Sequence, residues 1–531
     1  MAKRCTPNKP CGGGMQKGLF NPFFIGSGGG TADTTADGRQ AILVLGDSIP
    51  AGLTSHTAST LPAAGTAYEY DRNTNTIINF GAGAGITGFS FNSKSPWAKF
   101  CIDYNANSGY KPVIINRAAA SSTVSPAISG LVGNDWQTSG TNYNAAITAA
   151  DDCLAQLGLT KLKAIHIIAL INDVQGQSGT GPLTVAQISA YYDTFIGNLI
   201  AHFGSDVPII VSAIGLTDTI RVNTKLTGCR NISIQKSVST ANHYIGASLT
   251  SFFVNGLFES DNIHPNVTGN DYLGAMFARW HKNSTITNKW ARAIISSHFD
   301  ELSDTYKGTI QSVISANETA YLNSDMLYNF WTTLKLNANF DWTFRCGPEA
   351  DGGYSFVANS HISSDGSTPT LFNLGYSQSI SPLMATQNDC LLEVSLKQVD
   401  TPSGTTAAPI GSLSSGANSL LRQLNTLGIN WTMRTNTSFT YAGESSFGAG
   451  SYMLLRSASN ASALYKNGVS VATTATASTA GATGNMVLGA FLNTGVVTSP
   501  IAAQYKRCMA AKQSTISDKV AFLAALDTLH P

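Results

Sequence analysis

The sequence predicts a doubly wound, parallel α/β sheet followed by a connector helix and a C-terminal β-sandwich. A chain of 531 residues exceeds what one hydrophobic core usually serves, so we expect at least two domains. In the first half, apolar strand-like runs alternate with amphipathic helical patterns, which is typical of parallel βαβ units. Further on, short β-like runs broken by Gly, Ser, Thr and Asn are typical of a sandwich. We therefore expect a flexible arm, an α/β domain, a helical connector and a sandwich at 1–38, 39–283, 284–339 and 340–531.

Hydrophobic periodicity predicts the strands and helices of the first half. Continuous apolar runs predict buried parallel strands at 42–45, 112–116, 164–171, 207–214 and 250–254. Apolar residues that recur every three or four positions predict helices at 143–157, 185–203 and 272–282, and a short one through Trp97, Phe100 and Tyr104. The long insertion after the first strand, 54–109, is expected to form one wall of a cleft, because such loops carry binding residues.

A serine follows the first strand directly. The apolar run 42–45 stops abruptly at Gly46-Asp47-Ser48. Active sites of open α/β sheets lie outside the carboxyl ends of the strands, so Ser48 stands where a nucleophile would stand. The alternative is a Gly-Asp-Ser turn that merely closes the strand. A second stretch far downstream favours the nucleophile.

That stretch is SDNIHPNVTG, residues 260–269. Asp261 and His264 stand three residues apart before Pro265, on a loop, so one tight turn can bring the carboxylate to the Nδ1 atom of the imidazole. On its own such a pair usually belongs to a surface loop. After a strand-ending Gly-Asp-Ser, it completes a Ser, Asp and His set for nucleophilic catalysis. We predict that Ser48, Asp261 and His264 converge at the carboxyl edge of the sheet.

At these residues the chain resembles the GDSL or SGNH hydrolase family of esterases. Gly46-Asp47-Ser48-Ile49 resembles the nucleophile block of the family, and Asp261-Asn262-Ile263-His264-Pro265 resembles its Asp/His block. NRAAASS (116–122) and LIND (170–173) resemble the two intervening blocks, but Ser121 and Leu170 stand where the family usually has glycine. The resemblance covers 39–283, about half of the chain, and implies the same doubly wound fold.

The resemblance implies acyl transfer without a metal or cofactor. Ser48 would attack an acyl carbonyl, His264 would take its proton, and Asp261 would orient the imidazole. The backbone N–H groups of Ser48 and Ser121 and the side-chain amide of Asn172 would form an oxyanion hole, each donor worth roughly 3 kcal/mol in the transition state. The Gly-x-Ser-x-Gly elbow of α/β-hydrolases is not matched, because Pro50 occupies the position of its second glycine.

The cysteines give no sign of a metal site. The eight of them contain no C-x-x-C pair and no cysteine and histidine spacing typical of zinc, so buried free thiols are expected. Cys5 and Cys11, both in the arm, have two further alternatives, a disulfide or contact with a partner. The arm itself surrounds a short apolar patch, 19–25, with glycines; it either attaches to a larger assembly or is disordered.

Composition excludes some partners. Charged residues make up 12% and the net charge is +1, which argues against electrostatic capture of nucleic acid or an anionic membrane. No apolar run approaches the roughly 18–20 residues of a transmembrane helix, and no apolar region follows the basic N-terminus, so a secretory signal is not expected. Low charge with many Ser, Thr, Asn and Gly is typical of proteins that work outside a cell or in a virus particle.

The second half is expected to begin with helices. An apolar stripe from Trp290 to Val313 predicts one long helix, 289–317, followed by a helical piece at 323–334. The long helix either pairs with copies of itself in an oligomer or packs on its own chain; Gly308 and the lack of sustained heptads favour the second alternative. Beyond it, β-like runs are found at 390–398, 428–435, 450–457, 462–466, 469–473 and 486–489.

This end of the chain resembles the concanavalin A-like (laminin G-like) modules common in bacteriophage virion proteins. The resemblance is carried by ALYKNGV (463–469), by NMVLGAF (485–491) and by a closing helix at 517–529, with Asn467-Gly468 predicted as a hairpin turn. Such sandwiches often bind glycans through exposed Trp or Tyr, although the fold alone does not prove binding.

Together the two resemblances imply a serine esterase of a phage virion, in the tail or attached to the capsid. Its expected substrate is an O-acetyl group on a bacterial surface polysaccharide, and its expected partners are other virion proteins, held through the arm. Two alternatives stay open. One is a catalytically inactive adhesion or decoration protein of the same fold that binds host glycans, and the other is a secreted bacterial lipase or esterase.

Overall fold

In the computed structural model, residues 31–531 form one compact unit. The described residues are 33–52, 60–81, 95–126, 135–175, 183–215, 224–346, 354–365, 372–374, 388–399, 406–414, 417–424, 428–435, 437–444, 447–478, 486–488, 491–493, 496–498 and 502–530. The predicted arm up to residue 32, with Cys5 and Cys11, lies outside them.

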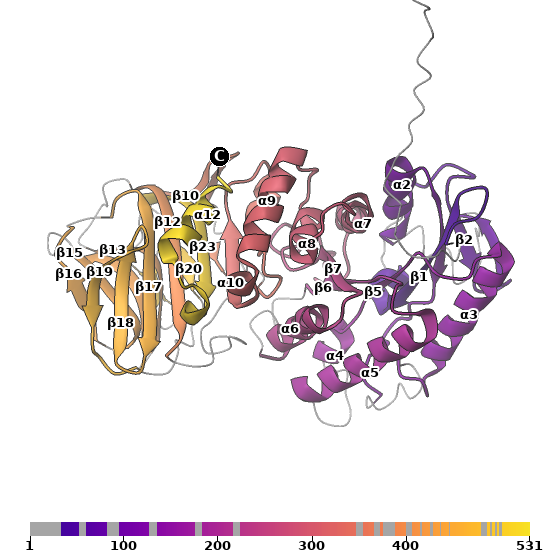
Figure 1. Ribbon diagram of the computed structural model, residues 1–531, viewed down its shortest axis with the longest axis horizontal. Coiled ribbons are helices and arrows are strands. Elements are labelled where there is room, and N and C mark those ends of the chain that lie inside the picture. Colours follow the sequence, from indigo (N-terminus) through magenta and orange to yellow (C-terminus); the bar gives the residue numbers. More distant parts are fainter. Residues whose placement is uncertain are drawn as a thin grey trace, which may run out of the picture. The chain divides into compact units, whose positions relative to one another are not determined.

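Within the described residues, the first half forms a seven-stranded sheet in the order β3-β2-β4-β1-β5-β6-β7. Figure 1 labels β2, β1, β5, β6 and β7 of this sheet. All neighbours pair in parallel except β3, which joins β2 as an antiparallel edge strand. In the central strand β1, every residue after the first is buried, which explains the unbroken apolar run from Ala41 to Leu45. The strands are β1 Arg39–Gly46, β2 Tyr68–Asp71, β3 Thr76–Asn79, β4 Lys111–Asn116, β5 Ala164–Ile168, β6 Ile209–Ala213 and β7 His243–Ser248.

Helices cover both faces of this sheet, so the prediction of a doubly wound α/β half is confirmed. Helices α2, α7 and α8 lie on one face and α3, α5 and α6 on the other (Figure 1). The capping box of Thr184 and Gln187 starts α5, and its bounds are those predicted. The helices are α1 Ser48–Ala51, α2 Trp97–Ser108, α3 Thr141–Leu157, α4 Ile171–Gln175, α5 Val185–Phe203, α6 Thr224–Ser239, α7 Val267–Lys282 and α8 Lys289–Ser297.

Two strand predictions in this half were wrong in place or extent. The last strand is β7, whereas 250–254 forms turns whose apolar side chains, such as the fully buried Phe252, fill the core without joining a ladder. The run 164–171 ends its strand at Ile168, and Ile171 already begins α4. The insertion 54–109 contains β2 and β3, so part of it extends the sheet.

The predicted connector also differs from the structure. The stripe 289–317 forms two helices, α8 and α9 Asp304–Ala316, because the chain is extended at His298 and Ser303 caps the start of α9. The helix predicted at 323–334 is wrong. Residues Ser324–Asn329 form strand β8, which pairs with β23, and all six are buried, the polar Ser324, Asp325 and Asn329 included. The short helices α10 Glu318–Leu322 and α11 Lys335–Ala338 flank it.

The second half forms two mainly antiparallel sheets that share a core, as predicted for a sandwich. One sheet has the order β19-β18-β17-β12-β23-β10-β9 with β8 beside β23, and the other contains β11, β20, β13, β14, β15 and β16, with β21 and β22 at its side. The hairpin at Asn467-Gly468 is confirmed: both residues have positive φ, and Lys466 pairs with Val469. The strands are β9 Ser355–Val357, β10 His361–Asp365, β11 Phe372–Asn373, β12 Cys390–Val399, β13 Thr406–Ser414, β14 Ala417–Leu424, β15 Gly428–Thr435, β16 Phe439–Tyr441, β17 Gly450–Ala458, β18 Ala461–Lys466, β19 Val469–Thr474, β20 Val487–Leu488, β21 Phe491–Asn493, β22 Val496–Thr498 and β23 Ala502–Ala511.

Strand β12 is buried on both of its faces from Cys390 to Leu396. Leu392 and Val394 belong to the core between the two sandwich sheets, whereas Leu391 on the opposite face belongs to the core of the helical half. The closing helix α12, Lys519–Asp527, also contributes Phe522 to the core of the helical half. The polar residues Glu393 and Ser395 of β12 are therefore buried as well.

Candidate active site

The end of β1 places Ser48 against the neighbouring strand β5. Gly46 has φ +129°, and a Cβ there would lie 1.8 Å from the carbonyl oxygen of Ile168, so only glycine fits. The next backbone N–H, of Asp47, donates to that same carbonyl at 3.0 Å. Asp47 then caps α1 by accepting from the N–H of Ile49 at 3.3 Å. Ser48 is the first residue of this short helix and is partly exposed.

The structure brings Ser48, His264 and Asp261 together in one hydrogen-bonded chain. The Nε2 atom of His264 lies 2.8 Å from the Oγ atom of Ser48, and its Nδ1 atom lies 2.6 Å from the Oδ2 atom of Asp261. These three residues are the ones the sequence predicts to converge, although 216 positions separate Ser48 from His264. An imidazole held between a hydroxyl and a carboxylate can take the hydroxyl proton as the oxygen attacks.

A tight turn holds Asp261 in place. Its Oδ1 atom accepts from the N–H groups of Ile263 at 2.9 Å and His264 at 3.0 Å, and Asn262, which directly follows Asp261, has φ +56°. Partial burial acts to raise the pKa of Asp261, but the hydrogen bonds from His264 and from the N–H of Ile263 outweigh it and keep the pKa below 3.8. The carboxylate is therefore charged at neutral pH and can stabilise an imidazolium.

The loop after β4 lies against the end of β1. The N–H of Ala119 donates to the carbonyl of Gly46 at 3.0 Å, and the hydroxyl of Ser122 donates to the same carbonyl at 2.9 Å. The side-chain amide of the buried Asn172, in the first turn of α4, donates to the carbonyl of Ser122 at 2.9 Å. This bond uses one of the two amide hydrogens and fixes the plane of the other. Asn172 and the loop that carries Ser121 are thus joined next to the strand that ends at Ser48.

Ser121 and Leu170 both occupy left-handed backbone. Ser121 has φ +57° and Leu170 has φ +77°. These are the two positions where the resemblance leads us to expect glycine. Both positions therefore have the backbone conformation that glycine adopts most readily, at a cost of about 1 kcal/mol or more for each non-glycine residue.

Two buried carboxyl groups, those of Asp47 and Asp173, lie next to the residues of the candidate site. Asp173 accepts from the N–H groups of Val124 at 2.9 Å and Ser125 at 3.1 Å, which ties α4 to the loop after Ser122. Burial raises the pKa of Asp173. Burial also raises the pKa of Asp47 to about 7, and the charge of Asp173 adds to this rise. Sequence reasoning missed this pair, because only the fold brings the two carboxyl groups together.

Asp47→Asn is expected to flatten the pH dependence of stability. The folded chain keeps the Asp47 proton up to about pH 7, whereas the unfolded chain releases it near 3.8. The folded state therefore binds more protons in this window, and the free energy of unfolding falls as pH rises through it. Asparagine keeps the acceptor for Ile49 but has no proton to release. Urea unfolding of both proteins between about pH 5 and 8 tests this, and parallel curves would contradict it.

The remaining expectations about ligands concern cysteines, metals and membranes. The six cysteines within the described ranges are free and buried. Among the described side chains, no group of three or more His, Cys, Asp or Glu is arranged to hold a metal ion. No helix in the described part of the chain is both long enough and apolar enough to cross a membrane.

Comparisons with known proteins leave the family open. No family model matches the chain, and no curated protein matches it. Among solved structures, a protein from Arabidopsis thaliana is 13% identical, with a TM-score of 0.34 over 46% of this chain and 98% of that chain. The CBM40 of Ruminococcus gnavus IT-sialidase is 18% identical, with a TM-score of 0.23 over 29% of this chain and 92% of that one.

A sialidase from Trypanosoma rangeli in complex with 2,3-difluorosialic acid is 12% identical, with a TM-score of 0.27 over 36% of this chain. The chain spans 31% of the length of that sialidase. At these TM-scores, the likenesses establish neither a family nor a function for this chain.

Proposed function

We propose that the protein is a serine esterase. The observation that carries the proposal is the chain of hydrogen bonds from Ser48 Oγ to His264 and on to Asp261, at 2.8 and 2.6 Å. Both are hydrogen-bond distances, short enough for direct transfer of a proton. The resemblance to GDSL or SGNH hydrolases at the same residues supports the proposal.

Acyl transfer would proceed in two halves. As the Oγ atom of Ser48 attacks the acyl carbonyl, its proton passes to Nε2 of His264, and the charged Asp261 stabilises the resulting imidazolium. The proton then passes to the leaving alcohol, which leaves an acyl group on Ser48. Water attacks this ester in the second half, with His264 again accepting a proton. The negative oxygen of each tetrahedral intermediate would be stabilised by the N–H groups of Ser48 and Ser121 and by the amide of Asn172.

The O-acetyl group of a bacterial surface polysaccharide is the substrate we propose. Support comes from the low charge of the chain and from the resemblance of its C-terminal end to phage virion modules. The test is acetate release from O-acetylated host polysaccharide, beside hydrolysis of 4-nitrophenyl acetate. If the protein hydrolyses neither ester, the alternative of a catalytically inactive adhesion protein is favoured. Recovery of the intact chain from purified virions tests the proposed location in a tail or on a capsid, and its absence there would favour the secreted esterase.

Glycan binding by the second half is a further candidate function, favoured by one tryptophan. Six of the seven tryptophans are buried, but Trp331 is only partly buried and lines a cavity of about 490 Å³. The same cavity is lined by Tyr306, Thr332, Thr333 and Asn359. An aromatic face beside hydroxyl and amide groups suits the apolar face and the hydroxyls of a sugar ring.

Trp331→Ala is expected to weaken binding of the polysaccharide by about tenfold, because it removes the aromatic face of the cavity. Trp331→Phe keeps an aromatic ring and is expected to keep most of the affinity. Isothermal titration of the two variants and the unchanged protein with O-deacetylated polysaccharide measures this effect. Equal affinities for all three proteins would exclude the cavity as a glycan site.

A further inference from the structure

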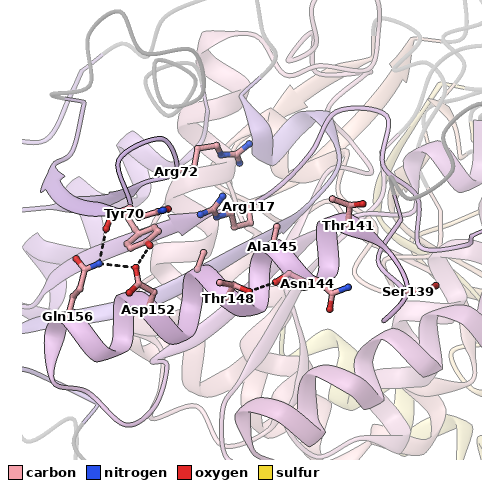
Figure 2. A pocket seen from close by; sticks show the side chains of 12 residues that line it. Tyr70, Arg72, Arg117, Ser139, Thr141, Asn144, Ala145, Thr148, Asp152 and Gln156 are labelled. Carbon is pink, nitrogen blue, oxygen red and sulfur yellow. Dashed lines mark hydrogen bonds between the residues drawn. The ribbon is translucent and has the colours of Figure 1, made fainter.

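A second cavity lies at the same sheet edge as Ser48, beside α3. It measures about 990 Å³, and Figure 2 shows the side chains around it. Arg72 and Arg117 lie in its middle, with Tyr70 and Asp152 towards one end and hydroxyl and amide groups towards the other. The polar side chains at that second end are those of Ser139, Thr141 and Asn144.

The sheet order explains why two arginines meet here. Strands β2 and β4 are parallel neighbours, and the residue that follows each strand is an arginine, Arg72 after β2 and Arg117 after β4. The carboxyl ends of parallel neighbours lie together, about 5 Å apart. Since β4 is also the neighbour of β1, which ends just before Ser48, the two guanidinium groups and the candidate nucleophile share one edge.

Arg72 is fixed by the loop that follows β4. Its Nη2 atom donates to the carbonyl of Asn116 at 2.7 Å and to that of Ala118 at 3.2 Å. Its Nε atom is buried and has no hydrogen-bond partner among the described residues. One donor of this guanidinium is therefore left unsatisfied by the described residues.

Arg117 is held differently. Its guanidinium carbon lies 5.8 Å from the centre of the Tyr70 ring, and within the described ranges it forms no ion pair or side-chain hydrogen bond. The neighbouring carboxylates are engaged elsewhere. Asp71 accepts from the N–H of Asn73 and the hydroxyl of Thr74, and Asp152 accepts from Tyr70 and Gln156.

Two neighbouring guanidinium groups repel each other, and a bound anion would offset this repulsion. Burial lowers the pKa of Arg72 to about 10, and repulsion from Arg117 contributes. Both groups stay protonated at neutral pH. Among the described residues, no carboxylate lies within ion-pair distance of either, although the charge of Asp71 acts on Arg117. Arginine is well suited to bind a planar carboxylate through parallel hydrogen bonds.

We propose that this cavity binds the carboxylate of an acidic sugar in the polysaccharide whose ester is cleaved at Ser48. Arg72 and Arg117 would bind the carboxylate, and the polar side chains at the start of α3 would contact sugar hydroxyls. The proposal that this sugar belongs to the polysaccharide cleaved at Ser48 rests on the proposed esterase function. The proposal that the cavity binds a carboxylated sugar does not. The substrate class is thus an acylated acidic polysaccharide, in contrast to a neutral one.

Binding of trigalacturonate and of the neutral galactotriose, measured by isothermal titration at low salt, tests the proposal. The unchanged protein is expected to bind the acid at least about tenfold more tightly, and Arg117→Gln is expected to remove that preference. Arg117→Lys keeps the charge but not the planar fork, so an intermediate affinity is expected. Arg39→Gln is the matched control, because Arg39 also lies over a tyrosine ring, that of Tyr68 at 4.4 Å, but outside the cavity.

Melting temperatures show whether each variant is folded. Arg72→Gln removes a donor to two carbonyls and is expected to be the less stable variant, so Arg117→Gln is the decisive one. Equal affinity for the two sugars, or unchanged acid binding in Arg117→Gln, would overturn the proposal. Tighter binding of galactose 6-phosphate than of trigalacturonate would also overturn it in favour of a phosphate site. No bond is cleaved in this assay, so it tests the carboxylate site alone. If the protein shows the arginine-dependent preference but has no esterase activity, the esterase function is refuted and the carboxylate site is not.

Discussion

Replacing Ser48 with alanine is expected to lower kcat for 4-nitrophenyl acetate by about 10⁴-fold or more. The substitution removes the oxygen that attacks the carbonyl, while His264 and Asp261 keep their mutual hydrogen bond at 2.6 Å. Ser48 is partly exposed, and among the described residues its hydroxyl is hydrogen-bonded to the side chain of His264, so the melting temperature is expected to change little. Steady-state hydrolysis at pH 7 to 8 measures the loss.

Ser312→Ala is the matched control, since it makes the same chemical change on the exposed face of α9. It is expected to leave kcat unchanged. A Ser48→Ala protein that retains more than about one per cent of the activity would contradict the role of this hydroxyl, because loss of a nucleophile costs far more than a hundredfold.

Asn172→Ala is expected to lower kcat by about 10²- to 10³-fold with a much smaller change in KM. The donor would act on the oxyanion of the transition state and only weakly on the ground-state carbonyl, so the loss falls on kcat. The substitution also removes the hydrogen bond to the carbonyl of Ser122, which would lower stability by about 1–3 kcal/mol.

Asn242→Ala separates these two effects. The side-chain amide of Asn242 donates to the carbonyl of Val207 at 2.8 Å, directly before β7 and so at the opposite, amino edge of the sheet. A similar loss of stability with normal kcat is expected for this control. If Asn172→Ala retained kcat within about threefold while folded, the amide would have no part in an oxyanion hole.

Much of the fold could be predicted because local patterns agree with it. The helix 185–203 begins at a capping box and keeps one apolar face, and β1 is apolar from Ala41 to Leu45 because both of its faces are covered. The hydrophobic pattern does not distinguish a helix from a strand where every side chain of a segment is buried. The run around Ser324–Asn329 is compatible with either a buried helix or a buried strand, and only its pairing with β23 decides between them.

The candidate site was predictable in part for a related reason. Asp261 and His264 meet through three residues of local turn, and Ser48 ends a recognisable strand, so parallel-sheet geometry alone brings them to one edge. The pairs Asp47 with Asp173 and Arg72 with Arg117 carry no such local signal. Arg72 follows β2, which lies inside what reads as a glycine-rich insertion, and its neighbour in the sheet is 45 residues further along the chain.

The most direct test of the central claim is covalent labelling with a fluorophosphonate, followed by mass spectrometry of the peptides. This reagent reacts with a serine hydroxyl only when a neighbouring base activates it. One adduct per chain is expected, on Ser48, with labelling at least about 10²-fold slower in His264→Asn, which lacks the base. An unlabelled chain, or an adduct on another residue with Ser48 unmodified, would contradict the proposal that Ser48, His264 and Asp261 form a catalytic triad.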